Sequence, residues 1–183
     1  TQVGNRRRFD RQLNREWKRL QREGLPLSLI MCDVDCFKLY NDNYGHQKGD
    51  ICLKAIARAL SKQVKRSIDR VARYGGEEFA IILPNLDSFG AGQVADAINQ
   101  AVEQLKIPNK ASFVSDYITL SLGVATLIPK NGQSPDELVK YADSALYEAK
   151  RLGRNRSVSK NPGQQFTELP VQKHPEENNA FKN

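Results

Sequence analysis

The chain has 183 residues, of which 39% are apolar, and this size and composition indicate one globular domain rather than a peptide or a membrane protein. No stretch approaches the roughly 20 consecutive apolar residues of a spanning helix, so we expect no membrane segment. The 28 Lys and Arg residues outnumber the 21 Asp and Glu residues, and the net charge of +7 favours anionic ligands such as nucleotides. No helix-turn-helix or zinc-finger pattern points to a nucleic acid partner.

The three cysteines, Cys32, Cys36 and Cys52, are odd in number, and no two of them have CxxC spacing. A disulfide framework and a zinc site are therefore not expected, and the cysteine usage fits a reducing cytoplasm. The basic residues gather in a few short segments, a pattern that solvated helix faces alone would also produce.

Hydrophobic periodicity predicts the elements of the first half of the chain. Residues 5–23 form an amphipathic helix that Gly24 ends. The apolar stripe of this helix consists of Phe9, Leu13, Trp17 and Leu20. The continuous apolar run 25–34 predicts a buried strand, and the polar residues 41–49 predict a loop. Residues 50–64 predict a second amphipathic helix. Its buried face would consist of Ile51, Ala55, Ile56, Ala59 and Leu60.

A β-hairpin is predicted next, because two short apolar runs lie on either side of Gly75 and Gly76. Glycine alone tolerates the positive φ angles of tight two-residue turns, so we expect this pair to form such a turn. A helix over residues 91–106 and an alternating strand over residues 117–127 follow.

The last predicted helix begins at Ser134, which with Glu137 forms a capping box, and it stops at Gly153. From Ser157 onward the composition is polar, so residues 1–156 are the expected domain and residues 157–183 an expected flexible tail outside the core. The order of elements predicts an α/β sandwich with antiparallel hairpin strands in its sheet.

Two pairs of carboxylates demand a chemical explanation. Asp33 and Asp35 end the first predicted strand, and Glu77 and Glu78 directly follow the hairpin glycines. Buried carboxylates are costly unless they are paired or hold a metal, and oxygen ligands on adjacent strands suit Mg²⁺ when a phosphate substrate supplies other ligands. Alternation places Glu77 and Glu78 on opposite sides of the hairpin and turns Asp35 away from Asp33. For either pair alone, exposed acidic strand ends are the alternative.

The chain resembles one family in four stretches. The hairpin, Arg73-Tyr74-Gly75-Gly76-Glu77-Glu78-Phe79, resembles the signature of the GGDEF family, the diguanylate cyclases, in its GGEEF form. Residues 33–50 resemble the family's D-x-D-x-F-K-x-x-N-D-x-x-G-H-x-x-G-D stretch at every anchor, and residues 142–155 resemble its C-terminal helix motif. The first residues, TQVGNRRR, resemble its N-terminal L-T-G-L-x-N-R-R, with Gln2 and Val3 where Gly and Leu are usual. The resemblance spans residues 1–156.

The resemblance implies a palm fold similar to that of nucleotide cyclases, with a mostly antiparallel mixed sheet flanked by helices. It also implies the family's reaction, which condenses two GTP molecules into cyclic di-GMP and two pyrophosphates. Two domains, each holding one GTP, would face each other as a homodimer. By resemblance, Asp33, the Val34 carbonyl and Glu77 hold Mg²⁺, with Mn²⁺ as an alternative. Glu77 would also help to deprotonate the attacking ribose 3′-hydroxyl.

Further binding roles follow from the same resemblance. Lys38, as a catalytic residue, would hold phosphates and stabilise developing charge together with Lys150 and Arg154. The remaining substrate-binding set is Asn41 and Asp50 at the guanine edge, His46 at the guanine pocket, and Gly75, Gly76 and Glu78 at the hairpin. Four residues apart, Lys150 and Arg154 can share one face of a helix end, where a favourable interaction with the helix dipole is the alternative.

An RxxD pattern formed by Arg66 and Asp69 lies five residues before Gly75, where the family has its product-inhibition site, and Arg73 is nearby. Arginine forks and an Asp acceptor suit guanine edges and phosphates, so cyclic di-GMP is implied as an inhibitor. Cys36 stands where the family often has an aromatic residue or His, which affects the expected nucleotide affinity.

The chain begins inside the N-terminal motif, so we expect the output domain of a longer protein with an upstream sensor or receiver domain. A catalytically silent domain that binds GTP or cyclic di-GMP as a sensor is the alternative function. A polymerase-like or purine-cyclase nucleotidyl transferase is a third possible function. Such enzymes also use metal ions for catalysis but do not have the GGEEF hairpin.

Overall fold

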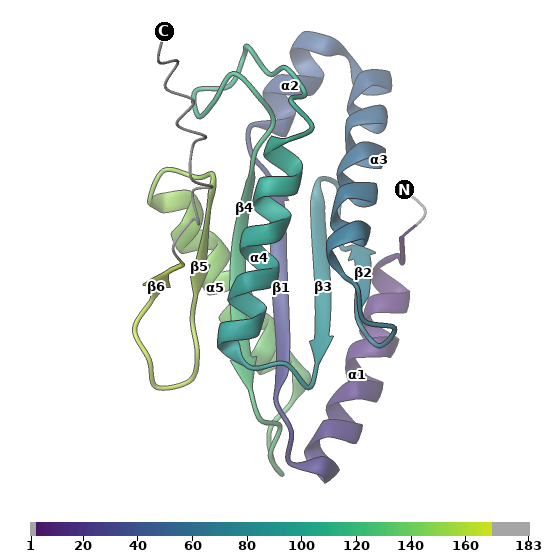
Figure 1. Ribbon diagram of the computed structural model, residues 1–183, viewed down its shortest axis with the longest axis vertical. Helices are drawn as coiled ribbons and strands as arrows, with labels where there is room; N and C mark the ends of the chain where they lie inside the picture. The colour runs from purple at the N-terminus through teal and green to yellow at the C-terminus, as the bar shows by residue number, and fades with distance from the viewer. Residues whose placement is uncertain (1–2, 170–183) are drawn as a thin grey trace, which may run out of the picture.

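Apolar runs form the strands of one six-stranded sheet in the computed structural model, which describes residues 3–169 (Figure 1). In chain order the strands are β1 (Leu27–Val34), β2 (Arg70–Arg73), β3 (Glu78–Pro84), β4 (Leu120–Leu127), β5 (Arg156–Ser159) and β6 (Thr167–Glu168). Their spatial order is β2-β3-β1-β4-β5-β6. All neighbours are antiparallel except β4 and β5, which are parallel. The predicted α/β class with a mostly antiparallel mixed sheet is confirmed.

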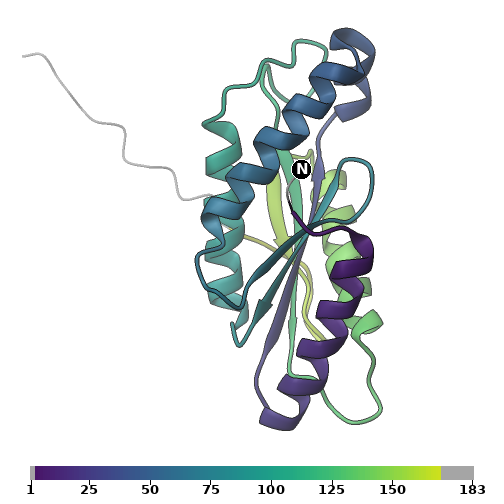
Figure 2. The ribbon, with the colours of Figure 1, turned by 90° about the vertical axis from the view of Figure 1, so that its right-hand side faces the viewer.

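Helices cover both faces of this sheet (Figure 2). They are α1 (Arg6–Glu23), α2 (Phe37–Tyr44), α3 (His46–Gln63), α4 (Ser88–Glu103) and α5 (Pro135–Arg151). The central strand β1 is buried on both sides, because Ile30 and Cys32 pack toward α3 and α4, whereas Leu29 and Met31 pack toward α1 and α5. No helix within residues 3–169 is long and apolar enough to cross a membrane.

The first helix matches its prediction closely. Asn5 caps it by accepting the main-chain N–H of Arg8 on its side-chain oxygen at 3.0 Å, and Gly24 ends it at a left-handed φ of 66°. The predicted stripe of Phe9, Leu13, Trp17 and Leu20 is buried. Packing against the sheet of its own domain therefore accounts for the apolar face of α1.

The prediction of a loop over residues 41–49 is wrong. Helix α2 runs to Tyr44 and α3 begins at His46, so only Gly45 separates the two helices. Most side chains of this segment are exposed, so it carries little apolar periodicity to reveal a helix. Ile51, predicted to be buried, is 65% exposed. The predicted burial of Ile56, Ala59 and Leu60 is confirmed, and Cys52 is buried in the first part of the helix where Ile51 is not.

The predicted two-residue turn at Gly75 and Gly76 is also wrong. Neither glycine has a positive φ. The N–H of Tyr74 donates to the carbonyl of Glu78 at 2.8 Å, so three residues, 75–77, connect the two strands. The longer connection removes the need for the backbone conformation that only glycine tolerates in tighter turns.

The core extends beyond the domain end predicted at residue 156. Strand β5 pairs with β4 and buries Val158 completely. Farther along, the N–H of Leu169 donates to the carbonyl of Ser157 at 3.0 Å, and the Leu169 side chain lies against Gly92 of α4. The strand was missed because Val158 is its only large apolar residue. The rest of the predicted tail, residues 170–183, lies outside the described residues.

Candidate active site

Two carboxylates from neighbouring strands meet near one end of the sheet. The register of β1 and β3 places Asp33 opposite Glu78. Nζ of Lys150, from α5, lies 2.9 Å from Oδ2 of Asp33, whose side chain is 14% exposed. Burial raises the pKa of Glu78, the charge of Asp33 raises it further, and Lys150 opposes both effects. Two like charges thus share a half-buried corner with one ammonium group.

The hairpin loop is shaped around these carboxylates. A Cβ atom at Gly75 would lie 2.6 Å from Oε2 of Glu78, so the glycine leaves room for this carboxylate. Arg73, predicted near an inhibitory site, donates from Nε to the carbonyl of Gly76 at 2.8 Å. Glu77 lies in the loop between Gly76 and the start of β3. The close approach of Glu78, rather than a positive φ, explains the glycine at position 75.

The donor atoms of this corner fit a hard divalent cation. Carboxylate oxygens are suitable ligands, and a cation bound to Asp33 would reduce its repulsion of Glu78, which adds to burial in raising the pKa of Glu78. Within residues 3–169, no group of three or more His, Cys, Asp or Glu side chains is placed to hold a metal ion. The predicted ligands are the side chains of Asp33 and Glu77 and the carbonyl of Val34. Oxygens of the substrate or of water would therefore be needed to complete the coordination.

The predicted guanine-binding residues lie where α2 meets α3. Oδ1 of Asn41 is buried and has no hydrogen-bond partner among the described residues. Gly49 faces it so closely that a Cβ atom there would overlap this oxygen. His46 and Asp50 are exposed on α3. The corner thus offers a buried acceptor without a donor, next to an exposed carboxylate.

The start of α2 holds two further residues of interest. Cys36 occupies the N-cap position with a left-handed φ of 56° and makes no side-chain capping hydrogen bond. Lys38 follows in the first turn and is exposed. An ammonium group here is free to reach toward an anion beside the end of β1.

The prediction that Lys150 and Arg154 share one face of a helix end is wrong. Helix α5 ends at Arg151, and Arg154 follows it with a left-handed φ of 65°. The N–H of Arg154 donates to the carbonyl of Ala149 at 3.0 Å, which reverses the chain direction after the helix. Lys150 contacts Asp33, whereas the guanidinium of Arg154 lies against the ring of Phe113.

The expectation that alternation turns Asp35 away from Asp33 is wrong. Residues two apart in a strand point to the same face, and the hydroxyl of Ser121, which lies opposite Asp33 in β4, donates to Asp35. The Asp35 side chain is buried and accepts hydrogen bonds from the Thr119 hydroxyl at 2.8 Å, the Ser121 hydroxyl at 2.7 Å and the Asn155 main-chain N–H at 3.1 Å. Burial raises the pKa of Asp35, and these hydrogen bonds oppose the rise. Asp35 therefore joins β1 to β4 and to the turn after α5.

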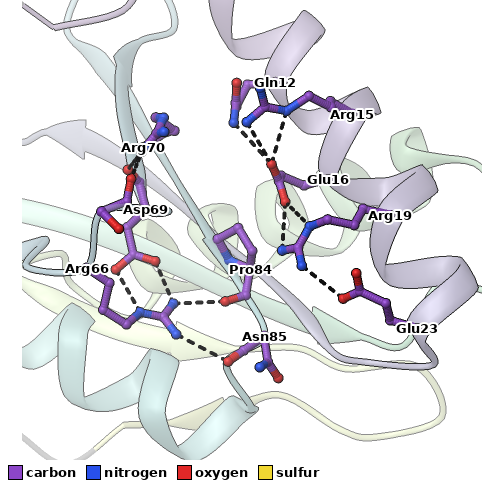
Figure 3. Close-up of polar contacts among 11 residues, drawn as sticks. Gln12, Arg15, Glu16, Arg19, Glu23, Arg66, Asp69, Arg70, Pro84 and Asn85 are labelled. Carbon is purple, nitrogen blue, oxygen red and sulfur yellow. Dashed lines mark hydrogen bonds and ion pairs between the residues drawn. The ribbon is translucent and has the colours of Figure 1, made fainter.

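The residues of the RxxD pattern are paired with each other (Figure 3). Nε and Nη2 of Arg66 lie 2.9 Å and 2.5 Å from the two carboxylate oxygens of Asp69. Arg66 also donates to the carbonyls of Pro84 and Asn85 at 3.0 Å and 3.2 Å. The guanidinium thus fastens the segment before β2 to the end of β3.

Sequence reasoning did not single out a cluster that supports the hairpin on the α1 and α5 face of the sheet, the face that also carries Asp33 and Glu78. The guanidinium carbon of Arg6 lies 3.6 Å from the centre of the Tyr74 ring, and Phe9 meets this ring edge-on at 5.1 Å. Burial raises the pKa of Asp143, against the effect of Arg6, and the charge of Asp143 also raises the pKa of Glu78. The available signal was the position of Asp143 inside the C-terminal helix motif.

Comparison with known proteins places the chain in a family. The sequence model described as "Diguanylate cyclase, GGDEF domain" matches residues 1–156. The chain belongs to the GGDEF family, and the predicted class, a diguanylate cyclase GGDEF domain, is confirmed.

Curated relatives bear related names. Diguanylate cyclase VdcA of Vibrio cholerae is 42% identical over 153 residues, which is 83% of this chain and 43% of the relative. Diguanylate cyclase A of Treponema denticola is 42% identical over 136 residues, which is 74% of this chain and 36% of the relative. The chain therefore spans less than half the length of these relatives.

Solved structures share the fold. The coiled coil and GGDEF domain of DgcB from Caulobacter crescentus, in complex with cyclic di-GMP, superposes with a TM-score of 0.79 at 33% identity, covering 87% of this chain and 83% of that one. The active GGEEF domain of a diguanylate cyclase from Vibrio cholerae gives a TM-score of 0.78 at 34% identity, covering 86% and 97%.

Proposed function

We propose that this chain is an active diguanylate cyclase domain that condenses two GTP molecules into cyclic di-GMP and two pyrophosphates. The observation that carries the proposal is the position of Asp33 opposite Glu78 and beside Lys150, at a hairpin whose GGEEF sequence is intact. A silent sensor domain would not need to keep this costly arrangement of like charges. That alternative is therefore not favoured.

In this proposal Asp33, the Val34 carbonyl and Glu77 hold Mg²⁺, with Mn²⁺ as an alternative. The bound metal would neutralise charge on the triphosphate oxygens as pyrophosphate leaves. Asp33 would then exchange its contact with Lys150 for the metal, and the freed ammonium group would bind phosphate oxygens. Lys38 and Arg154 would add positive charge from the start of α2 and from the turn after α5.

Base recognition would use the corner of α2 and α3. Oδ1 of Asn41 lacks a donor within residues 3–169, and a guanine N–H would supply one. Asp50 would accept further guanine N–H groups, and His46 would line the pocket. Glu77 in the hairpin loop would take the proton from the ribose 3′-hydroxyl that attacks the partner's α-phosphorus.

The reaction would require two copies of this domain, because each copy holds one GTP. We propose a homodimer of half-sites, paired by an upstream sensor or receiver domain in the longer protein. Cyclic di-GMP would bind at Arg66 and Asp69, near Arg73, and inhibit its own synthesis. The free state of Cys32, Cys36 and Cys52 supports a reducing, cytoplasmic location.

The test is to incubate the domain with GTP and Mg²⁺ and to identify the product by mass spectrometry, at protein concentrations that span a hundredfold range. Cyclic di-GMP is expected, with a specific activity that rises with protein concentration. Tight GTP binding without product at any concentration would favour the sensor alternative. A specific activity that stays constant on dilution would contradict separate half-sites.

A further inference from the structure

Two consecutive residues after α5 have a backbone conformation that side chains disfavour. Arg154 has a φ of 65° and Asn155 a φ of 47°, both in the left-handed region. Non-glycine residues keep this conformation only where their surroundings impose it, and such positions gather at functional sites. Contacts around Arg154 and Asn155 must therefore hold this strained backbone in place.

Hydrogen bonds fix the main chain of both residues. The N–H of Arg154 donates to the carbonyl of Ala149 at 3.0 Å, and its own carbonyl accepts Nε of Arg156 at 3.0 Å. The N–H of Asn155 donates to the buried carboxylate of Asp35 at 3.1 Å. Since Asp35 lies just beyond the end of β1, it ties the turn to the strand that carries Asp33.

The side chain of Arg154 is held differently. Its guanidinium carbon lies 5.1 Å from the centre of the Phe113 ring, within the range of a cation–π contact. None of the ion pairs among residues 3–169 involves Arg154. An aromatic ring restricts where the guanidinium lies without neutralising its charge.

Phe113 is exposed but belongs to an ordered loop. Its side chain is 72% exposed. The Ser112 hydroxyl oxygen accepts the N–H of Val114 at 3.0 Å, and the N–H of Ile118 donates to the carbonyl of Ile107 at 2.9 Å. The backbone of this loop is thus hydrogen-bonded on the C-terminal side of Phe113, whose exposed ring lies over a cation.

We propose that Phe113 is a positioning residue that holds the Arg154 guanidinium ready for the triphosphate of GTP, on a turn that Asp35 fixes. The inference rests on the proposed function, which gives Arg154 a phosphate to bind. Because the guanidinium is already placed and unpaired, binding loses less conformational entropy. Phe113 thereby contributes to GTP affinity without touching the nucleotide.

The test compares the dissociation constants of GTP and of guanosine, measured by calorimetry, for the parent and for Phe113→Ala, Phe113→Tyr and Phe113→Trp. Phe113→Ala should weaken GTP binding roughly two- to fivefold, the range of an exposed cation–π contact, and should leave guanosine binding unchanged. Tyr and Trp should restore GTP binding, because both rings attract a cation. Phe89→Ala is the matched control, because Phe89 on α4 is 75% exposed.

A double variant isolates the coupling. In an Arg154→Ala background, Phe113→Ala should have no further effect on GTP affinity. The inference is overturned if Phe113→Ala leaves GTP affinity unchanged, weakens guanosine equally, or acts as strongly without Arg154. Loss of activity through weaker dimerisation at unchanged GTP affinity would also overturn it. These are binding measurements, so they remain distinct from the absence of cyclic di-GMP, which would contradict the proposed function instead.

Discussion

The two aspartates at Asp33 and Asp69 are both nearly buried, yet their charges are balanced in different ways. Asp33 has one ammonium partner, Lys150, and lies opposite a second carboxylate, Glu78. Asp69 has both oxygens bound by the fork of Arg66, with its side chain 4% exposed. One corner has an excess of negative charge, whereas the other is neutralised within the chain.

A ligand therefore binds at Asp33 without displacing a full set of partners, whereas a ligand at Arg66 must compete with the partners that Arg66 already has. A cation at Asp33 removes repulsion that the fold leaves in place. An anion or a guanine edge at Arg66 must instead replace hydrogen bonds that the guanidinium already makes to Asp69, Pro84 and Asn85. The chain is therefore prepared for a metal at the first corner, whereas binding at the second requires Arg66 to exchange partners.

The largest expected effect separates the two hairpin glutamates. Glu77→Gln should lower the rate of cyclic di-GMP formation at least a hundredfold, because it removes a proposed metal ligand and the proposed base. Glu78→Gln should cost less, because it removes a charge that opposes Asp33. Product formation by both variants is measured by mass spectrometry, with thermal unfolding as a folding control. If Glu78→Gln is the more damaging change, the metal ligand on the hairpin is Glu78.

The neutralised corner is tested by Arg66→Ala. Loss of a charged, bidentate contact should weaken inhibition by cyclic di-GMP roughly ten- to a hundredfold, read from progress curves with added product. The same change leaves Asp69 buried without its partner, so it should also lower the free energy of unfolding. Adding Asp69→Asn should recover part of this stability but not the inhibition. Equal inhibition of parent and variant would leave Arg66 with a structural role only.

A smaller effect is expected at the ammonium group of the first corner. Lys150→Met should raise the KM for GTP roughly tenfold, because one phosphate contact is lost. It should also lower the Mg²⁺ concentration needed for half-maximal rate at saturating GTP, since Lys150 no longer competes for Asp33. Without Lys150 the pKa of Glu78 should rise further, and any acid limb due to Glu78 should move to higher pH. Unchanged Mg²⁺ dependence would contradict this competition.

Periodicity was sufficient for the long apolar elements and insufficient for the short polar ones. Helix α1 and strand β1 were predicted because each has a sustained apolar pattern. Helix α2 was missed because it is short and its second half is polar, and β5 because it has one large apolar residue. Motif spacing named the candidate site residues. The register that sets Glu78 against Asp33, and the contact of Arg154 with Phe113, join residues far apart in sequence, and tertiary packing alone determines them.

The smallest expected effect concerns Asp96 on α4. No ion pair within residues 3–169 involves this carboxylate, whereas Asp69 is paired with Arg66 and Asp33 with Lys150. Oδ1 of Asp96 is buried and has no hydrogen-bond partner within the described part of the chain. Burial raises the pKa of Asp96 from 3.8 to about 6. The folded state therefore holds this proton more tightly than the unfolded chain does. The charged carboxylate lowers stability above pH 6, and the penalty disappears as the pH falls toward 3.

Asp96→Asn should consequently stabilise the domain at pH 7.5 by about 1 kcal/mol, a figure reduced for the partial exposure of this side chain. The gain should vanish near pH 3, below both pKa values, where the parent is protonated in the folded and the unfolded state. Denaturant unfolding at the two pH values measures the difference. An equal gain at both would mean that the amide makes a new contact and that the charge of Asp96 has no cost. Loss of stability at pH 7.5 would mean that a cation neutralises Asp96, as Arg66 neutralises Asp69.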